Sequence, residues 1–188
     1  MTTIHTIGHS TRPIEGFIAL LQAHGVTQLV DIRTVPRSRH NPQFAQDALA
    51  ASLAEAGLGY HYLKQLGGLR SKVKDSTNLG WRNQSFRNYA DHMQTDDFRQ
   101  GIAALLEIAQ RGQTAIMCAE AVPWRCHRSL VGDALLARGV SVLDIIGEAA
   151  PKPHKLTSFA VVDGQQVSYP GPTADQVDAE PADSPPQN

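Results

Sequence analysis

The chain has 188 residues, of which 41% are hydrophobic and 19% are charged, and its formal net charge is −1. This length fits one domain with a tail, and the apolar share is enough for a core, which excludes a fully disordered chain. No apolar run is long enough to span a bilayer and the first ten residues do not form a signal peptide, so we expect a cytoplasmic protein without a membrane partner. Two cysteines do not make a disulfide scaffold.

The charges are unevenly distributed along the chain. Five of the 18 acidic residues follow Ala160, where there is no Lys or Arg, so the first 160 residues hold 17 basic and 13 acidic groups and carry a net charge of +4. Nine of the basic residues fall in two short segments, 33–39 and 64–87, and the only acid within them is Asp75. Clustered cations with few counter-charges favour an anionic ligand, and two solvated loops are the simpler alternative.

In the first third of the chain, short β-branched runs alternate with segments whose apolar residues recur at helical spacing. We expect Ser10 or Thr11 to cap the first helix. The predicted elements, in chain order, are a strand at 4–7, a helix that begins near Pro13 and ends at Gly25, a strand at 28–32, a helix from Phe44 to Gly57 and a strand at 59–63.

A basic, glycine-rich stretch from Lys64 to Gln84 shows no periodicity and is predicted to be a long loop, which in a compact domain is usually functional or mobile. The elements predicted after it are a short helix at 86–93, a longer helix that follows Asp96 and Asp97 and ends at Gly112, a strand at 114–118, a helix opened by Pro123 and ended by Gly139, and a strand at 140–146.

Strands that alternate with helices predict an α/β domain over residues 1–150, with a mostly parallel five-stranded sheet and helices on both faces, a Rossmann-like three-layer sandwich. Residues 151–170 form a C-terminal extension in which a hairpin is possible between Ser158 and Tyr169, around Asp163-Gly164. The acidic, proline-rich residues 171–188 are expected to be disordered.

In parallel sheets, ligands bind outside the carboxyl ends of the strands, and four segments of this chain carry reactive or charged side chains at that predicted edge. The predicted catalytic residues are His9, Asp31, Glu120, Cys126 and His127, and the predicted ligand-binding residues are Gly8, Ser10, Arg33, Arg39, Arg125 and Arg128. Cys126, His127 and Arg128 are also expected near a helix N-terminus, where unpaired N–H groups attract anions.

Each of these residues also has a purely structural interpretation. Either cysteine can be a small buried hydrophobe, His9 can cap a helix, Asp31 can pair with Arg33, and Trp124 is expected to serve packing. The sequence lacks a G-x-x-x-x-G-K-[ST] phosphate loop, a G-x-G-x-x-G fingerprint and a C-x-x-C motif. Its cysteine spacing does not predict a structural zinc site, although convergence of Cys118, Cys126 and a histidine on a metal in space stays open.

Several linked motifs together resemble a known family, the domain of unknown function 488. They are Thr6-Ile7-Gly8-His9-Ser10, Val30-Asp31-Ile32-Arg33 followed by Pro36 and Ser38-Arg39, Leu66-Gly67-Gly68, Cys118-Ala119-Glu120 and Cys126-His127-Arg128. The resemblance runs from about Thr3 to Ile146 and implies a compact α/β domain. It implies no reaction, because the family is named for lacking one.

The leading functional hypothesis is an enzyme or binding protein for a phosphate-bearing small molecule, nucleotide or nucleic-acid component, because arginine binds phosphate through paired N–H donors. A non-enzymatic nucleic-acid-binding module is the first alternative, with Trp81 and Phe86 interleaved in the basic stretch. A metal or redox protein that uses the cysteines and a histidine is the second alternative. The sequence indicates no particular cofactor.

Overall fold

The computed structural model describes residues 1–173, and the expected disorder of 171–188 therefore concerns residues that lie mostly outside the described part. Its main sheet has six strands in the order β3-β2-β4-β1-β5-β6. The strands are β1 (Thr3–Gly8), β2 (Gln28–Asp31), β3 (Gly59–Tyr62), β4 (Thr114–Cys118), β5 (Ser141–Ile145) and β6 (Lys152–Pro153). The first five are parallel, as predicted, and β6 pairs antiparallel with β5.

The prediction of five strands is therefore wrong by one edge strand. Strand β6 has two exposed residues and one of them is proline, so it lacks the apolar, β-branched run by which a strand is detected. It pairs with β5 through Leu143↔Pro153 and Asp144↔Lys152. The extension thus begins by closing one edge of the sheet.

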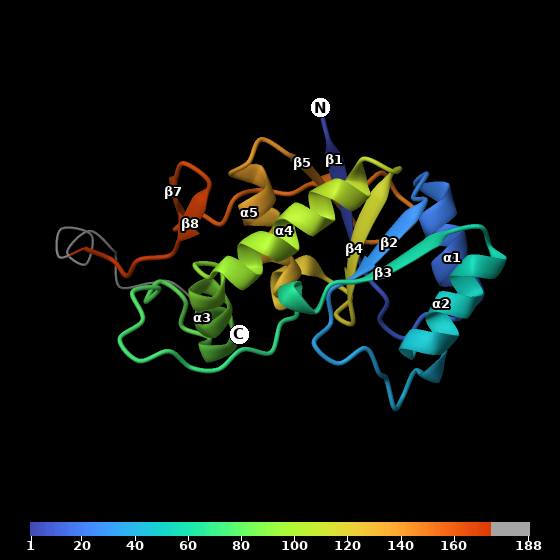
Figure 1. Ribbon diagram of the computed structural model, residues 1–188, viewed down its shortest axis with the longest axis horizontal. Coiled ribbons are helices and arrows are strands. Elements are labelled where there is room, and N and C mark those ends of the chain that lie inside the picture. The colour runs from blue at the N-terminus through green and yellow to red at the C-terminus, as the bar shows by residue number, and fades with distance from the viewer. Residues whose placement is uncertain (174–188) are drawn as a thin grey trace.

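Five helices cover the two faces of the sheet, which gives the three predicted layers (Figure 1). Helices α1 (Ile14–Ala23) and α2 (Gln46–Glu55) pack on one face, around a core that includes Phe17, Leu21 and Leu49. Helices α3 (Gln84–His92), α4 (Asp96–Ala109) and α5 (Arg128–Leu136) pack on the other face, around a second core. The chain passes from β1 through β2 to β3 at one edge of the sheet and then returns to β4 and β5. Because the crossovers are right-handed, the helices that follow this reversal lie on the opposite face from α1 and α2.

Three short 3-10 turns lie in the connections, η1 (Pro42–Phe44), η2 (Lys64–Leu66) and η3 (Pro123–Arg125). Two predicted helix starts are wrong. The N-cap of α1 is Pro13, without a side-chain cap bond, rather than Ser10 or Thr11. Pro123 opens η3 instead of α5, and α5 begins only at Arg128, with His127 at its N-cap.

The expected hairpin of the C-terminal extension is present as β7 (Val161–Asp163) and β8 (Gln166–Ser168), with Gly164 at a φ of 60° in its turn. Val167 and Tyr169 are buried in the same core as α3, α4 and α5. No helix among residues 1–173 is long and apolar enough to cross a membrane.

Candidate functional site

Strands β1 and β4 are neighbours in the sheet, but the chain leaves them toward opposite faces, to α1 and to α5. In α/β sheets, ligands bind outside the strand ends at such a reversal. Gly8 lies opposite Cys118 at the last paired position. The His9 amide donates to the Cys118 carbonyl over 2.9 Å and the Ser10 amide donates to the Ala119 carbonyl over 3.0 Å, so the two segments stay together beyond the sheet.

Asp31, at the end of β2, holds the side chain of Arg33. The Arg33 Nε and NH2 atoms donate to the two carboxylate oxygens over 2.9 and 2.7 Å, the Arg33 amide donates over 3.1 Å and the Tyr60 hydroxyl over 2.7 Å. Burial, together with the negative charge of Asp31, raises the pKa of Tyr60. Asp31 is fully engaged in these bonds, which fits the alternative interpretation of an Asp31–Arg33 pair and a positioning role for the carboxylate.

His9, which follows β1, is 2% exposed and stacks on the ring of Phe44. Its Nδ1 atom lies 2.7 Å from the Ser10 carbonyl, which can only accept, so Nδ1 carries the proton and Nε2 is free to accept. The Nε2 atom accepts from NH1 of Arg33 over 3.4 Å. Burial lowers the pKa of His9, and the positive charges of Arg33 and Arg128 act in the same direction. At neutral pH His9 is therefore an uncharged imidazole.

Arg128, the first residue of α5, is the largest fully buried side chain among the described residues, with 0% exposure. Its NH1 atom donates to the Cys118 sulfur over 3.1 Å and to the Glu120 carbonyl over 2.9 Å. Its Nε and NH2 atoms have no hydrogen-bond partner, and no carboxylate within residues 1–173 forms an ion pair with it. Burial lowers the pKa of Arg128 to about 10, so the guanidinium is charged at neutral pH.

The sulfur atoms of Cys118 and Cys126 are in contact, with the two Cα atoms 7.4 Å apart. The Cys126 sulfur accepts from the Arg128 amide over 3.4 Å and lies 3.4 Å from Nδ1 of His127. The Nε2 atom of His127 donates to the Ile32 carbonyl over 2.9 Å, which leaves Nδ1 as an acceptor toward Cys126. Burial lowers the pKa of His127 to about 4, so this imidazole is also neutral.

The structure thus brings His9, Asp31, Arg33 and the Cys126-His127-Arg128 turn to one place, as predicted, but other candidates point elsewhere. The side chains of Glu120, Arg39 and Arg125 are exposed, and the hydrogen bond between Glu120 and Arg128 is made by the Glu120 backbone carbonyl. Trp124 is 63% exposed, so its expected packing role is wrong.

Two predicted ligand-binding residues contribute through the backbone. A Cβ atom at Gly8 would lie 1.6 Å from the Glu120 carbonyl oxygen, which only glycine avoids. Ser10 adopts a φ of 49° and offers its carbonyl to His9. Sequence reasoning missed Phe44 and Tyr60 as neighbours of His9 and Asp31, since their roles depend on contacts between elements. Cys118, at the end of β4, was weighed as a buried hydrophobe or a metal ligand but was not among the predicted site residues.

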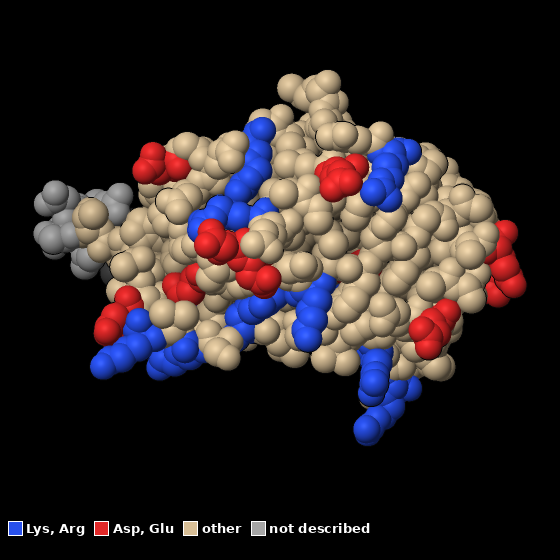
Figure 2. All heavy atoms as spheres, in the orientation of Figure 1, with Lys and Arg blue, Asp and Glu red and all other residues tan. Residues whose placement is uncertain are grey.

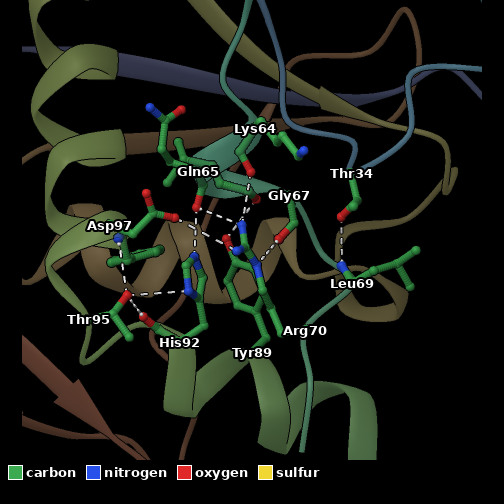
Figure 3. Close-up of polar contacts among 12 residues, drawn as sticks. Thr34, Lys64, Gln65, Gly67, Leu69, Arg70, Tyr89, His92, Thr95 and Asp97 are labelled. Atoms are coloured by element: carbon green, nitrogen blue, oxygen red, sulfur yellow. Dashed lines mark hydrogen bonds and ion pairs between the residues drawn. The ribbon is translucent and has the colours of Figure 1, made fainter.

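The basic stretch after β3 is held against α3 and α4 rather than free (Figure 3). Arg70 turns inward and donates from Nε to the Gly67 carbonyl and from NH2 to the Lys64 and Gln65 carbonyls. The Tyr89 hydroxyl donates to the Leu66 carbonyl over 2.8 Å, and the Thr34 hydroxyl accepts from the Leu69 amide over 2.8 Å. Trp81 of the stretch packs in a cluster with Phe86 of α3 and with Phe159 and Tyr169 of the C-terminal extension.

Among residues 1–173, no group of three or more His, Cys, Asp or Glu side chains is arranged to hold a metal ion. A hollow of about 240 Å³ lies between α4, α5 and the hairpin, lined by residues such as Phe98, Arg138 and Val167. It is remote from the strand ends, so it does not lead to Arg128, which lies beneath the segment 119–125.

Comparison with family models gives one match, to "Domain of unknown function DUF488", over residues 13–135. Comparison with curated proteins gives no match, and comparison with solved structures gives none either. The matched range ends inside α5 and contains all the predicted site residues except Gly8, His9 and Ser10. Since the match covers more than half of the chain, the protein belongs to the DUF488 family.

Proposed function

We propose that this protein binds a phosphate-bearing ligand, either a small molecule, a nucleotide or a nucleic-acid component, at the carboxyl ends of β1 and β4. The observation that carries the proposal is the guanidinium of Arg128, which is fully buried and charged and has two donor nitrogens without a partner. A buried charge left unpaired costs about 3–5 kcal/mol. A bound anion would remove that cost.

Phosphate is the anion that fits this arrangement best. The unused Nε and NH2 atoms belong to the same planar fork, which matches two phosphate oxygens at once. Arg128 also stands at the first position of α5, where the helix dipole favours negative charge. Arg33, aligned by Asp31, supplies a second buried guanidinium at the end of β2.

Exposed cations lie on the loops that leave this edge of the sheet. Figure 2 shows Lys and Arg side chains along the lower edge of the molecule, where the loops that follow β2 and β3 lie in Figure 1. The exposed basic residues of these loops and of η3 are Arg37, Arg39, Lys64, Lys72, Lys74, Arg82 and Arg125. They would raise the local concentration of an anionic ligand, and the ligand would displace the segment 119–125 to reach Arg128.

Calorimetric titration with inorganic phosphate, pyrophosphate and nucleoside monophosphates tests the binding. We expect saturable binding of at least one of them, weakened about tenfold or more by Arg128→Lys, because lysine lacks the planar fork. The matched control is Arg111→Ala, which removes an exposed cation between α4 and β4, away from the carboxyl ends of the strands, and should change the affinity less than twofold. Binding that is absent in the wild-type protein, or equal in wild type and Arg128→Lys, would contradict the proposal.

If the protein is an enzyme, His9 is the group that moves the proton. It is neutral, Nε2 is its accepting atom, and that atom lies beside the Arg33 guanidinium. His9→Gln should then leave phosphate binding within about threefold of wild type and abolish turnover of whichever phosphate compound the titrations identify. If His9→Gln loses phosphate binding but turns over bound ligand at the wild-type rate, His9 serves binding and not proton transfer.

The exposed lysines favour a second candidate, a module that binds a nucleic-acid backbone. In this case a single-stranded oligonucleotide should bind more tightly than a mononucleotide, and its affinity should fall steeply with salt. The double variant Lys72→Ala and Lys74→Ala should weaken oligonucleotide binding and flatten the salt dependence. An unchanged affinity would exclude this candidate in favour of the small ligand.

A further inference from the structure

The sulfur atoms beside Arg128 are its nearest groups that can carry a negative charge. The guanidinium donates to the Cys118 sulfur over 3.1 Å, and its other partner is the neutral backbone carbonyl of Glu120. Arg128 and Cys118 are both excluded from solvent, so water does not screen their interaction. The carboxylates of Asp144 and Glu120 also attract Arg128, but neither forms an ion pair with it among residues 1–173, so a thiolate at Cys118 would be the negative charge in direct contact with the guanidinium.

We propose that reduced Cys118 is a thiolate paired with Arg128, and that Cys118 and Cys126 form a reactive dithiol that a hydroperoxide converts into an intramolecular disulfide. The contacts of the two sulfurs differ in a way that assigns their roles. The Cys118 sulfur faces a permanent cation. The Cys126 sulfur faces Nδ1 of His127, which can accept a hydrogen bond because Nε2 donates to the Ile32 carbonyl, so Cys126 stays a thiol that donates to His127.

The reaction follows from this assignment. The Cys118 thiolate attacks one oxygen of the hydroperoxide, the O–O bond breaks, and the departing hydroxide or alkoxide takes a proton from solvent, which leaves Cys118 as a sulfenic acid. The Cys126 thiol passes its proton to Nδ1 of His127 and its sulfur attacks the Cys118 sulfur. The S–O bond breaks, and the hydroxide leaves as water with the proton returned by His127. A dithiol reductant reverses the reaction by exchange.

The positions of the two cysteines suit this second step. Their side chains meet with the two Cα atoms 7.4 Å apart, slightly beyond the usual disulfide range, so the bond forms with a small movement of the backbone on one side. The sulfurs are buried, with Cys118 at the end of β4 and Cys126 directly after η3, which favours a small oxidant over a bulky disulfide substrate. This inference shares Arg128 with the proposed phosphate site, because the thiolate contacts NH1 of the guanidinium whose Nε and NH2 atoms a phosphate would bind. None of its redox steps uses a phosphate ligand, so the two proposals can fail separately.

Ultraviolet absorbance of the thiolate in the fully reduced, ligand-free protein tests the charge assignment. A free thiol has a pKa of about 8.5, so it contributes almost no thiolate signal near pH 6. We expect the wild-type protein to retain the signal of about one thiolate at that pH, Cys118→Ser to lose it and Cys126→Ser to keep it. Absence of the signal in wild type, or its loss only in Cys126→Ser, would overturn the assignment.

Stoichiometric hydrogen peroxide tests the reaction. After treatment and alkylation, wild-type protein should carry no alkyl group, weigh less by two hydrogen atoms and recover both thiols on addition of a dithiol. Cys126→Ser should stop at a sulfenic acid, because Cys118 then lacks a resolving partner. Thiols that remain alkylatable in treated wild type, or a disulfide that joins two chains, would refute the proposed dithiol whatever the phosphate titrations show.

Discussion

Gly8 is the residue at which the two halves of the candidate site approach most closely. Its position at the end of β1 allows the Glu120 carbonyl to lie where a side chain would begin, and the same carbonyl accepts from Arg128. A Cβ atom there would also lie 2.8 Å from NH1 of Arg128. The contacts of the buried guanidinium therefore depend on the absence of a side chain at position 8.

The substitution Gly8→Ala should lower the free energy of unfolding by about 2 kcal/mol or more, since backbone rather than a flexible side chain must move. The matched control is Gly16→Ala in α1, where a Cβ atom meets nothing within 4 Å and alanine should stabilise the helix by about 0.5–1 kcal/mol. Urea unfolding of both variants measures the difference. Equal stabilities would show that the Glu120 carbonyl has room to move.

Sequence reasoning found the centre of the site because the order of strands and helices determines which residues follow a strand end. His9, Arg33 and Arg128 were identified in this way, and they do meet. The same reasoning failed for Arg39 and Glu120, whose side chains are exposed. A strand end predicts where the backbone lies, whereas the direction of each side chain depends on contacts made by distant elements.

At the scale of elements, the long basic stretch after β3 is a loop as predicted, but the contacts that hold it were not predicted. Its lack of periodicity was a valid signal for a loop, and residues 67–83 indeed contain neither helix nor strand. The role of Arg70 was not predictable, because its partners are backbone carbonyls of η2 and of Gly67, which leave no trace in the sequence. Arg70, one of the nine clustered basic residues, thus holds the loop together from inside (Figure 3).

Substitution of Arg70 should loosen the loop without unfolding the protein. The substitution Arg70→Gln removes hydrogen bonds together worth about 1.4 kcal/mol, so local opening of residues 64–70 should become about tenfold more frequent. Hydrogen exchange of peptides from this segment measures the opening. Lys72→Gln, an exposed neighbour, should exchange like wild type. If Arg70→Gln also leaves exchange unchanged, the Tyr89 and Thr34 contacts alone hold the loop.

The whole molecule is larger than the part that the family model covers. The matched range, residues 13–135, omits the inner strand β1, strand β5 and the C-terminal extension. Yet Asp133, a fully buried carboxylate of α5, has all its hydrogen-bond partners in the extension, namely His154, Thr157 and Tyr169. The extension therefore belongs to the folded unit, and its bonds to Asp133 were not predictable because they join residues far apart in the sequence.

His154 joins the extension to the domain through two acids, which makes stability depend on pH. Burial alone would lower its pKa, but hydrogen bonds to Asp133 and Asp144 outweigh burial and raise the pKa of His154 from 6.5 to about 9. A raised pKa means that the folded state holds the proton more tightly than the unfolded state. The stabilisation is complete below about pH 6.5 and is lost as the pH rises through about 9.

The free energy of unfolding should therefore fall by about 2 kcal/mol between pH 6 and pH 9.5, as measured by urea titration at each pH. His154→Gln should be less stable than wild type at pH 6 and should lack this fall, because glutamine does not titrate. His40→Gln, a change at an exposed histidine, should reproduce the wild-type profile. A fall of the same size in His154→Gln would assign the pH dependence to other groups and leave the extension attached mainly by Val167 and Tyr169.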